Sequence, residues 1–258
     1  RCCLQIAPIQ MWKEPKLHAR ATPLRLHPAN SAPPLIAAFL REMPHAIAES
    51  VPKGRTIIHQ DDYADHSMLL LDGWVGFSKM LPDGETQIID IMLPGDFALI
   101  GAAHAPVAAC SVEALSDARF INITPKDANG TGPERTELRA VMAAEIVRTQ
   151  TRTSELLLRL GQSNSASRIA YALLELFVRL QAIGRTDGVQ FDFPITQGKI
   201  GEFTGMTNVH VNRTLRRMER DGLISHPAPG VISLDDLDAL SNTAGIDLAA
   251  FKQGILLQ

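Results

Sequence analysis

Cysteine is scarce in this sequence. The 258 residues include only three cysteines, Cys2, Cys3 and Cys110, which are too few and too unevenly spaced for a disulfide framework. This usage is typical of a reducing compartment, and we expect a cytoplasmic protein. Since a protein-bound iron–sulfur cluster needs four cysteine ligands, the sequence also predicts that one chain does not hold such a cluster.

Long apolar runs and a large excess of either charge are also missing. No run approaches the roughly 18–20 apolar residues that cross a bilayer. The first residues do not form a basic start followed by an apolar core, so we expect neither a membrane segment nor a secretory signal. The net charge is only −3, so any binding to nucleic acid must depend on a local patch.

Motifs for catalysis are absent as well. The sequence contains no glycine-rich phosphate loop, no spacing typical of metal ligands and no nucleophile motif. The adjacent acids Asp61-Asp62 and Asp235-Asp236 are interpreted as loop and helix-cap charges. We therefore expect neither an enzyme nor a metal site.

The sequence does contain a strong pattern at residues 195–226, ITQGKIGEFTGMTNVHVNRTLRRMERDGLISH. It predicts two short helices joined by a tight turn. Thr196 and Thr207 can cap the two helices, and Gly205 can take the positive φ that a sharp turn between helices often needs.

The second helix has two different faces. One face is apolar, with Val211, Leu215 and Met218 at helical spacing. The other face is polar and basic, and it comprises Asn208, Val209, Asn212, Arg213 and Arg216, with Arg217 and Arg220 beside them. Because Arg can pair with guanine and Asn with adenine in the major groove, this face predicts a DNA-binding helix-turn-helix.

The stretch IGEFTGMTNVHVNRTLRRMERDGLIS resembles the winged helix of the Crp-Fnr regulators, the family of the cyclic-AMP receptor protein and the fumarate-nitrate reduction regulator. The resemblance extends more loosely from about residue 35 to about residue 238. It implies an α+β chain divided into an N-terminal arm (1–34), a cyclic-nucleotide-binding-like β-roll sensor domain (35–132), a dimerisation helix (133–162), a winged helix-turn-helix DNA-binding domain (163–238) and a C-terminal extension (239–258).

The resemblance also implies roles on the DNA face. Arg213 matches the family's base-reading arginine, and the side chains expected to meet DNA beside it are Asn208, Val209, Asn212, Arg216 and Arg217. Gln197, Lys199 and Thr207 are better placed for phosphate, and His210 either donates to phosphate or points aside. Many members carry Glu where this chain has Val209, so the operator sequence cannot be transferred from them.

Residues 50–124 alternate short apolar runs with turn signals. Pro-Asp-Gly at 82–84 predicts a hairpin, and Asp72-Gly73 predicts another turn. Several short strands at this spacing indicate an antiparallel sandwich or roll, which resembles the family's cyclic-nucleotide-binding domain. Residues 35–49, by contrast, suggest one or two short helices.

The expected nucleotide-binding residues are missing from this roll. Members that bind cyclic nucleotide use a Gly-Glu pair and an Arg-Ser or Arg-Thr pair, because a buried phosphodiester needs a cation and backbone donors. The corresponding stretch here reads ALIGAAHAPVAACSVEAL, with small apolar residues where the arginine is expected. We therefore do not expect cyclic AMP to bind in the family's manner, and the pocket is either empty or suited to an uncharged effector.

Other sensor groups have little support. A haem iron needs a His or Cys ligand, and His45, His59, His66 and His104 are interpreted as structural or solvated side chains. Cys110 lies in an apolar context, so it is either a core residue or a redox-active thiol. No cofactor is therefore predicted.

Residues 133–161 predict one long helix, with Pro133 in its first turn. Its apolar stripe comprises Leu138, Val141, Met142, Ile146, Leu156, Leu157 and Leu160. The helix either packs on its own domain or, as the family implies, pairs with its copy in a homodimer. Thr153-Ser154 resembles the pair that faces the nucleotide base in the cyclic-AMP receptor protein, which makes these two residues candidates for an effector pocket.

The remaining C-terminal elements complete the expected domain. Residues 164–182 predict a helix, VQFDFPI a strand, and LISH with VISL a small hairpin around PAPG, the wing. The resulting hypothesis is a dimeric transcriptional regulator whose partners are two-fold symmetric double-stranded DNA and RNA polymerase. The alternative is a signalling module whose winged helix binds a protein partner.

Overall fold

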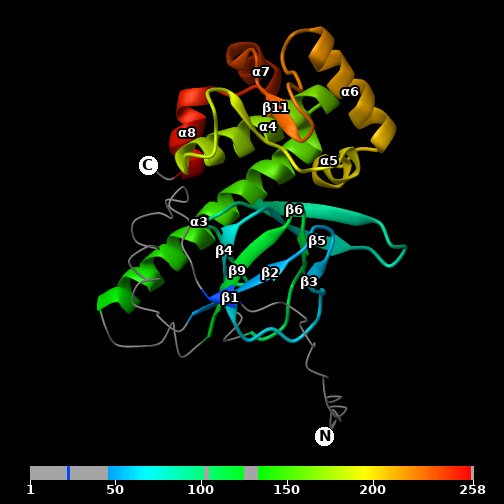
Figure 1. Ribbon diagram of the computed structural model, residues 1–258. Coiled ribbons are helices and arrows are strands. Elements are labelled where there is room, and N and C mark those ends of the chain that lie inside the picture. The colour runs from blue at the N-terminus through cyan, green and yellow to red at the C-terminus, as the bar shows by residue number, and fades with distance from the viewer. Residues whose placement is uncertain (1–21, 24–45, 102–104, 125–132, 257–258) are drawn as a thin grey trace, which may run out of the picture.

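The computed structural model describes residues 22–23, 46–101, 105–124 and 133–256. A roll of strands lies at one end, the long helix α3 (Pro133–Gln162) crosses the molecule, and a second group of helices lies at the other end (Figure 1). Cys2, Cys3, His45, His104 and most of the predicted arm fall outside the described residues.

The predicted antiparallel roll is confirmed by two facing sheets. The strands before α3 are β1 (Thr22–Pro23), β2 (Ile47–Val51), β3 (Thr56–Ile58), β4 (Ser67–Asp72), β5 (Val75–Met80), β6 (Thr86–Met92), β7 (Phe97–Ala98), β8 (Ser111–Ala114) and β9 (Ala118–Ile123). One sheet has the order β1-β2-β9-β4-β7 and the other β3-β8-β5-β6. The expected helix over residues 35–49 is wrong at its end, because β2 pairs residues 48–51 with β9.

Alternation of side chains explains how the first sheet is buried on both faces. Successive residues of a strand point to opposite faces. In β4, Met68 and Leu70 face the roll's interior, whereas Leu69 belongs to the cluster that packs against Leu138 of α3. The roll therefore needs α3 to cover it.

Two predicted turns are also confirmed. In the β5–β6 hairpin the Leu81 N–H donates to the Glu85 carbonyl at 2.8 Å, and Gly84 has φ 91°. Gly73 has φ 85°, and a Cβ there would lie 2.2 Å from the Asp117 carbonyl oxygen. Glycine is therefore required where the β4–β5 turn approaches β9.

Helix α3 divides its apolar residues between two sides. Leu138 and Leu156 are buried against the same chain, so they cannot belong to a dimer seam as the single predicted stripe implied. The exposed apolar side chains are Ile146, Val147, Leu157 and Leu158, with 51%, 48%, 70% and 49% of their surface accessible.

The C-terminal domain begins with α4 (Ser165–Ala182), whose first turn is capped by the Asn164 side chain. It continues through β10 (Gln190–Asp192), α5 (Gln197–Thr204), α6 (Asn208–Arg220), β11 (Val231–Ser233), α7 (Leu237–Ala244) and α8 (Leu248–Leu256). Leu240 of α7 and Ile255 of α8 are buried in the same cluster as α4, so residues 239–256 are an integral part of this domain rather than an extension of it.

The predicted wing hairpin is present. Ser225 and Ser233 exchange both backbone hydrogen bonds at 2.9–3.0 Å, and the Asp235 N–H donates to the Leu223 carbonyl at 3.0 Å. Strand β11 also pairs along its length with β10. Among the described residues, no helix is long and apolar enough to cross a membrane.

Candidate nucleic-acid interface

The two helices of the predicted motif are α5 and α6, and their caps are those expected from sequence. The Thr196 hydroxyl accepts from the Lys199 N–H and the Thr207 hydroxyl accepts from the His210 N–H. Gly205, at the end of α5, has φ 64°. These features place α6 at a fixed angle to α5 on the outside of the domain (Figure 1).

Close approach of the two helices depends on a glycine that the sequence reasoning missed. A Cβ on Gly201 would lie 2.5 Å from the Met206 carbonyl oxygen, so a larger residue would force the turn away from α5. The signal was available, because a small residue stands four positions before the turn glycine. Beneath the turn, Val211, Leu215 and Met218 are buried as predicted.

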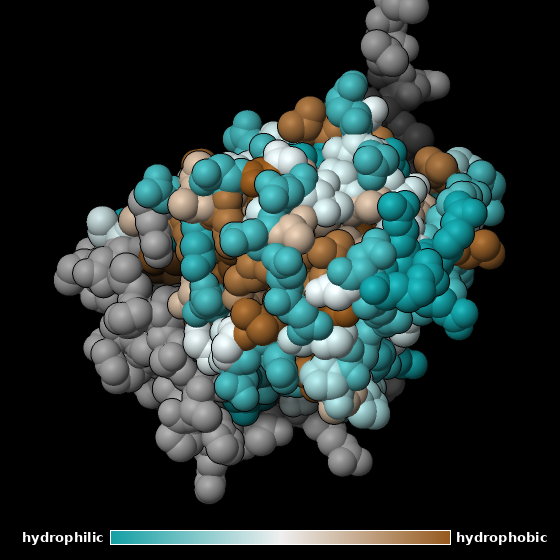
Figure 2. Space-filling model, turned by 90° about the horizontal axis from the view of Figure 1, so that it is seen from above, coloured by the Kyte–Doolittle hydropathy of each residue, from teal (hydrophilic) through white to brown (hydrophobic). Residues whose placement is uncertain are grey.

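The outer face of α6 is open to solvent. Val209 has 75% of its surface accessible, and Asn208, Arg213 and Arg216 are exposed. No hydrogen bond or ion pair joins Arg213 or Arg216 to another described residue, so both guanidinium groups are available to a ligand. Hydrophilic surface gathers on the side of the molecule where α6 lies (Figure 2).

Other predicted site residues are paired with one another. The Asn212 amide donates to the Gln197 side-chain oxygen at 3.0 Å, which joins α6 to the start of α5. His210 Nδ1 lies 2.8 Å from the Thr207 hydroxyl. This contact points the imidazole back to the helix cap, which matches the expectation that His210 points aside.

Arg217 lies at the edge of the same face. Its guanidinium is 3.5 Å from the Asp221 carboxylate, and both side chains are more than half exposed. A pair this open contributes little to stability and does not hold the arginine in place.

Lys199 was expected to contact phosphate, but in the structure it is paired with two carboxylates. Its ammonium lies 2.7 Å from the Glu113 carboxylate of β8 and 2.9 Å from Glu202. Burial would lower the pKa of Lys199, but the hydrogen bonds to the two carboxylates outweigh that effect and raise it. The ammonium is therefore charged and already neutralised by its own chain.

The structure adds a hollow lined by three arginines and by Asp221, which the sequence reasoning missed. This hollow of about 710 Å³ lies beside α6, and Arg213, Arg217 and Arg220 line one side of it. Its other side includes residues 164–166 at the N-terminus of α4. The free N–H groups of a helix N-terminus favour phosphate, and the Asn-Ser pair at 164–165 was a readable cap signal.

The residues proposed for an effector pocket lie on the surface of α3. Thr153 and Ser154 are exposed on α3, and the side chain that reaches the roll from this segment is Arg152, which is 4% exposed and bonded to Asp90. Cys110 is half-buried, and burial raises the pKa of its thiol while Lys79 opposes the shift. This environment decreases the thiolate fraction on which redox reactivity depends.

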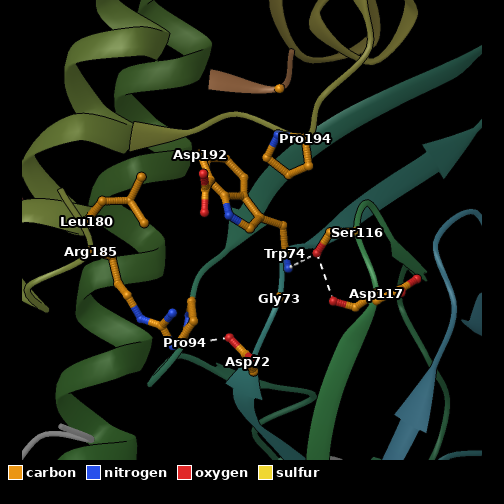
Figure 3. A pocket seen from close by; sticks show the side chains of 11 residues that line it. Asp72, Gly73, Trp74, Pro94, Ser116, Asp117, Leu180, Arg185, Asp192 and Pro194 are labelled. Atoms are coloured by element: carbon orange, nitrogen blue, oxygen red, sulfur yellow. Dashed lines mark hydrogen bonds and ion pairs between the residues drawn. The ribbon is translucent and has the colours of Figure 1, made fainter. Parts of the chain in front are cut away.

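The roll and the C-terminal domain enclose a hollow of about 470 Å³ (Figure 3). Trp74 lies within it and meets Phe193 edge-on, with ring centroids 6.1 Å apart. Asp72 and Arg185 form an ion pair of 3.1 Å across the same junction. These two contacts join the roll to the loop after α4 and to the segment before α5.

Known domains match both halves of this chain. Residues 167–243 match the Crp-like helix-turn-helix domain and residues 48–130 match the cyclic nucleotide-binding domain. The nitrogen fixation regulation protein FixK of Azorhizobium caulinodans is 30% identical over 188 residues, which cover 71% of this chain and 73% of that protein. The FixK of Bradyrhizobium diazoefficiens is 29% identical over 213 residues, with 78% and 84% covered.

The chain is also similar to another regulator and to a solved structure. The fumarate and nitrate reduction regulatory protein of Escherichia coli K12 is 26% identical over 199 residues, with 76% of this chain and 77% of that protein covered. The structure of FixK2 from Bradyrhizobium japonicum superimposes with a TM-score of 0.68 at 24% identity, with 77% and 96% covered. The chain therefore belongs to the Crp-Fnr family of DNA-binding transcriptional regulators.

Proposed function

We propose that the protein acts as a homodimer on a two-fold symmetric operator, with the exposed face of α6 in the major groove of each half-site. The observation that carries this proposal is the availability of Arg213 and Arg216. Both are exposed cations without a partner among the described residues, on a helix whose opposite face is anchored in the core.

The exposed residues of α3 support the dimer. Ile146 and Leu157 are eleven residues apart, as are Val147 and Leu158, and eleven residues make about three turns of an α-helix. The two rows are about 100° apart around the helix, so the four exposed side chains form one broad exposed stripe, and Ser154 falls between the rows. We infer that this stripe pairs with the same stripe of a second chain.

The DNA contacts follow from the availability of each group. We assign Arg213 to a base edge, with Asn208, Val209 and Arg216 beside it. Asn212 keeps Gln197 in place through their hydrogen bond, so these two residues approach DNA together. Thr207 and the α4 N-terminus face phosphates, and Arg217 completes the positive rim.

The lining of the roll supports an effector other than a cyclic nucleotide. Ala108 is 1% exposed and packs in an apolar cluster with Val112 and Phe120, so the described part of the stretch supplies no cation to a buried phosphate. We infer that cyclic AMP is not the effector, and we expect neither haem nor an iron–sulfur cluster. A regulator of this kind is proposed to contact RNA polymerase in the cytoplasm, where its DNA lies.

The rival function is a winged helix that binds a protein partner. Its best support is the apolar tip of the β5–β6 hairpin, where Met80 and Leu81 are 61% and 58% exposed. This tip belongs to the roll, however, and it does not explain the arginines of α6. DNA binding therefore accounts for more of the exposed surface.

The test is a selection of DNA fragments from a random pool by the purified chain under reducing conditions, without added nucleotide. We expect a two-fold symmetric site whose binding weakens steeply with salt. Leu157→Glu should weaken binding by preventing dimerisation, whereas the matched change Leu81→Glu on the roll should not. Recovery of no enriched sequence, with or without cyclic AMP, would count against the proposal.

A further inference from the structure

Five buried charged side chains and the partly buried Asp96 meet where the roll, α3 and α4 join. Arg152 of α3 donates to both oxygens of Asp90 on β6, at 2.8–3.1 Å, and to Glu145 at 2.9 Å. Arg179 of α4 donates to Glu175 at 2.9 Å and to Asp96, after β6, at 2.5 Å. We call these six residues the joint cluster.

The joint cluster contains more negative than positive groups. Its four carboxylates, Asp90, Asp96, Glu145 and Glu175, face two guanidinium groups, and each of the six side chains is at most 17% exposed. Arg148 adds a third cation at its rim, 3.4 Å from Glu145 and 36% exposed. One negative charge is therefore unbalanced in a medium where an unpaired charge is costly.

A proton is the cation that balances this site. The described residues contain no group of acids, histidines and cysteines arranged to hold a metal ion. Protonation of one carboxyl group would equalise the charges without any movement of the backbone.

Glu175 is the carboxyl group best suited to hold the proton. Among the described residues, it accepts a hydrogen bond from Arg179 only. Asp90 also accepts from the Ile91 N–H, and Asp96 from the Leu93 N–H. Glu145 lies between Arg152 and Arg148.

We propose that the joint cluster is a proton-binding site: Glu175 holds one proton while α4 is packed on the roll and releases it when the packing opens. The groups that face Glu175 are Arg179 and Tyr171 of α4, Asp90 of β6 and Arg152 of α3, with Asp96 and Glu145 completing the cluster. The proton thus links the roll to the domain that carries α6.

The direction of the pH effect follows from the environment. Burial raises the pKa of Glu175 above its ordinary value of 4.5, and Asp90 adds to the rise while Arg179 and Arg152 oppose it. A group whose pKa is raised in the packed state contributes stability that is complete below its ordinary pKa. That stability is lost as the pH rises through the raised pKa.

The experiment compares urea unfolding of the full chain with that of Glu175→Gln, from about pH 5 to about pH 8. All variants carry Trp12→Phe, so that Trp74, which packs on Phe193 across the junction, is the only tryptophan. We expect Glu175→Gln to gain stability relative to its parent by up to tenfold in the unfolding constant per pH unit. Burial raises the pKa of Glu145 as well, but two guanidinium groups hold its carboxylate, so Glu145→Gln should gain less.

The proposal would be overturned if the ratio of the parent's unfolding constant to that of Glu175→Gln did not change with pH. It would also be overturned if Glu145→Gln alone lost the pH dependence. If Glu175→Gln does not fold, infrared spectra of the unsubstituted chain at neutral pH provide the test. A carbonyl stretch of a protonated carboxylic acid supports the site, and its absence refutes it. Neither measurement uses DNA, so the result is independent of the proposed operator binding.

Discussion

Arginine is used in opposite ways in the joint cluster and on the outer face of α6. Arg152 is 4% exposed and shared by two carboxylates, whereas Arg213 is exposed and joined to no described residue. A guanidinium group in the joint cluster has its charge compensated inside the fold. On α6 the compensation is left to a ligand, and phosphates and base edges supply it.

The buried arginines of the joint cluster contribute to stability, whereas the exposed arginines of α6 contribute to recognition of DNA. Removing a buried cation leaves its carboxylates unpaired and destabilises the fold, whereas removing an exposed, unpartnered cation changes stability little. Four substitutions, taken in order of decreasing effect, test whether each of four cations contributes to stability or to DNA binding.

Arg152→Met should have the largest effect. It leaves Asp90 and Glu145 buried without their shared donor, which costs about 3–5 kcal/mol in the free energy of unfolding. Urea unfolding measures the change. Arg148→Met is the matched control, because Arg148 also contacts Glu145 but is 36% exposed, and its effect should stay under about 1 kcal/mol. Equal effects of the two changes would show that burial does not distinguish these cations.

Arg213→Ala should weaken DNA binding and leave stability almost unchanged, the opposite of Arg152→Met. We expect the free energy of operator binding to fall by about 1–3 kcal/mol, with relaxed specificity at one base pair of each half-site, while the free energy of unfolding changes by less than about 0.5 kcal/mol. Fluorescence anisotropy with the selected site and single-base variants of it measures both affinity and specificity. Unchanged affinity would mean that Arg213 does not face the groove.

The recognition face could be read from sequence because its signals are local. The caps Thr196 and Thr207, the turn residue Gly205 and the apolar positions of α6 lie within about two dozen residues, and each follows from helix geometry. The strands of the roll were likewise predicted from alternation and turns, although residues 47–49 were misread because an isolated apolar run fits either a helix or a strand.

The joint cluster could not be read in this way. Asp90 and Arg152 are 62 residues apart, and nothing in the sequence near either residue indicates a buried charge. Arg152 stands directly before Thr153-Ser154, the pair that the sequence marked as candidates for an effector pocket. Similarly, the burial of α7 and α8 depends on contacts with α4 that only the tertiary structure brings together.

Arg168 lies between the two extremes and sharpens the comparison. It is half-buried, and it donates to the backbone carbonyls of Leu160, Ser163 and Thr204 at 2.8–3.2 Å rather than to carboxylates. Arg168→Met should reduce the free energy of unfolding by about 1–2 kcal/mol, because carbonyls at helix ends lose a charged donor that water can partly replace. Chemical denaturation measures the change. A loss in the free energy of unfolding as large as that of Arg152→Met would contradict this estimate.

Lys199→Met should have the smallest effect of the four substitutions on stability and DNA binding taken together. The substitution tests whether Lys199 acts as a structural cation, like those of the joint cluster, or as a DNA contact, like those of α6. Its ammonium lies between Glu113 and Glu202, and the side chain is 23% exposed, so Lys199→Met should alter the free energy of unfolding by less than about 1 kcal/mol.

If the ammonium stays paired with the two carboxylates when DNA binds, Lys199→Met leaves the slope of log affinity against log salt concentration unchanged. If Lys199 moves to a phosphate, its loss makes that slope shallower by about 0.9 for each contact. Arg216→Met is the positive control, because no carboxylate of the described residues is paired with its guanidinium. We expect Arg216→Met to lower the slope and Lys199→Met to leave it unaltered. A reduced slope in both variants would instead show that the Lys199–Glu113 contact opens on DNA, and that the C-terminal domain shifts against the roll when it binds.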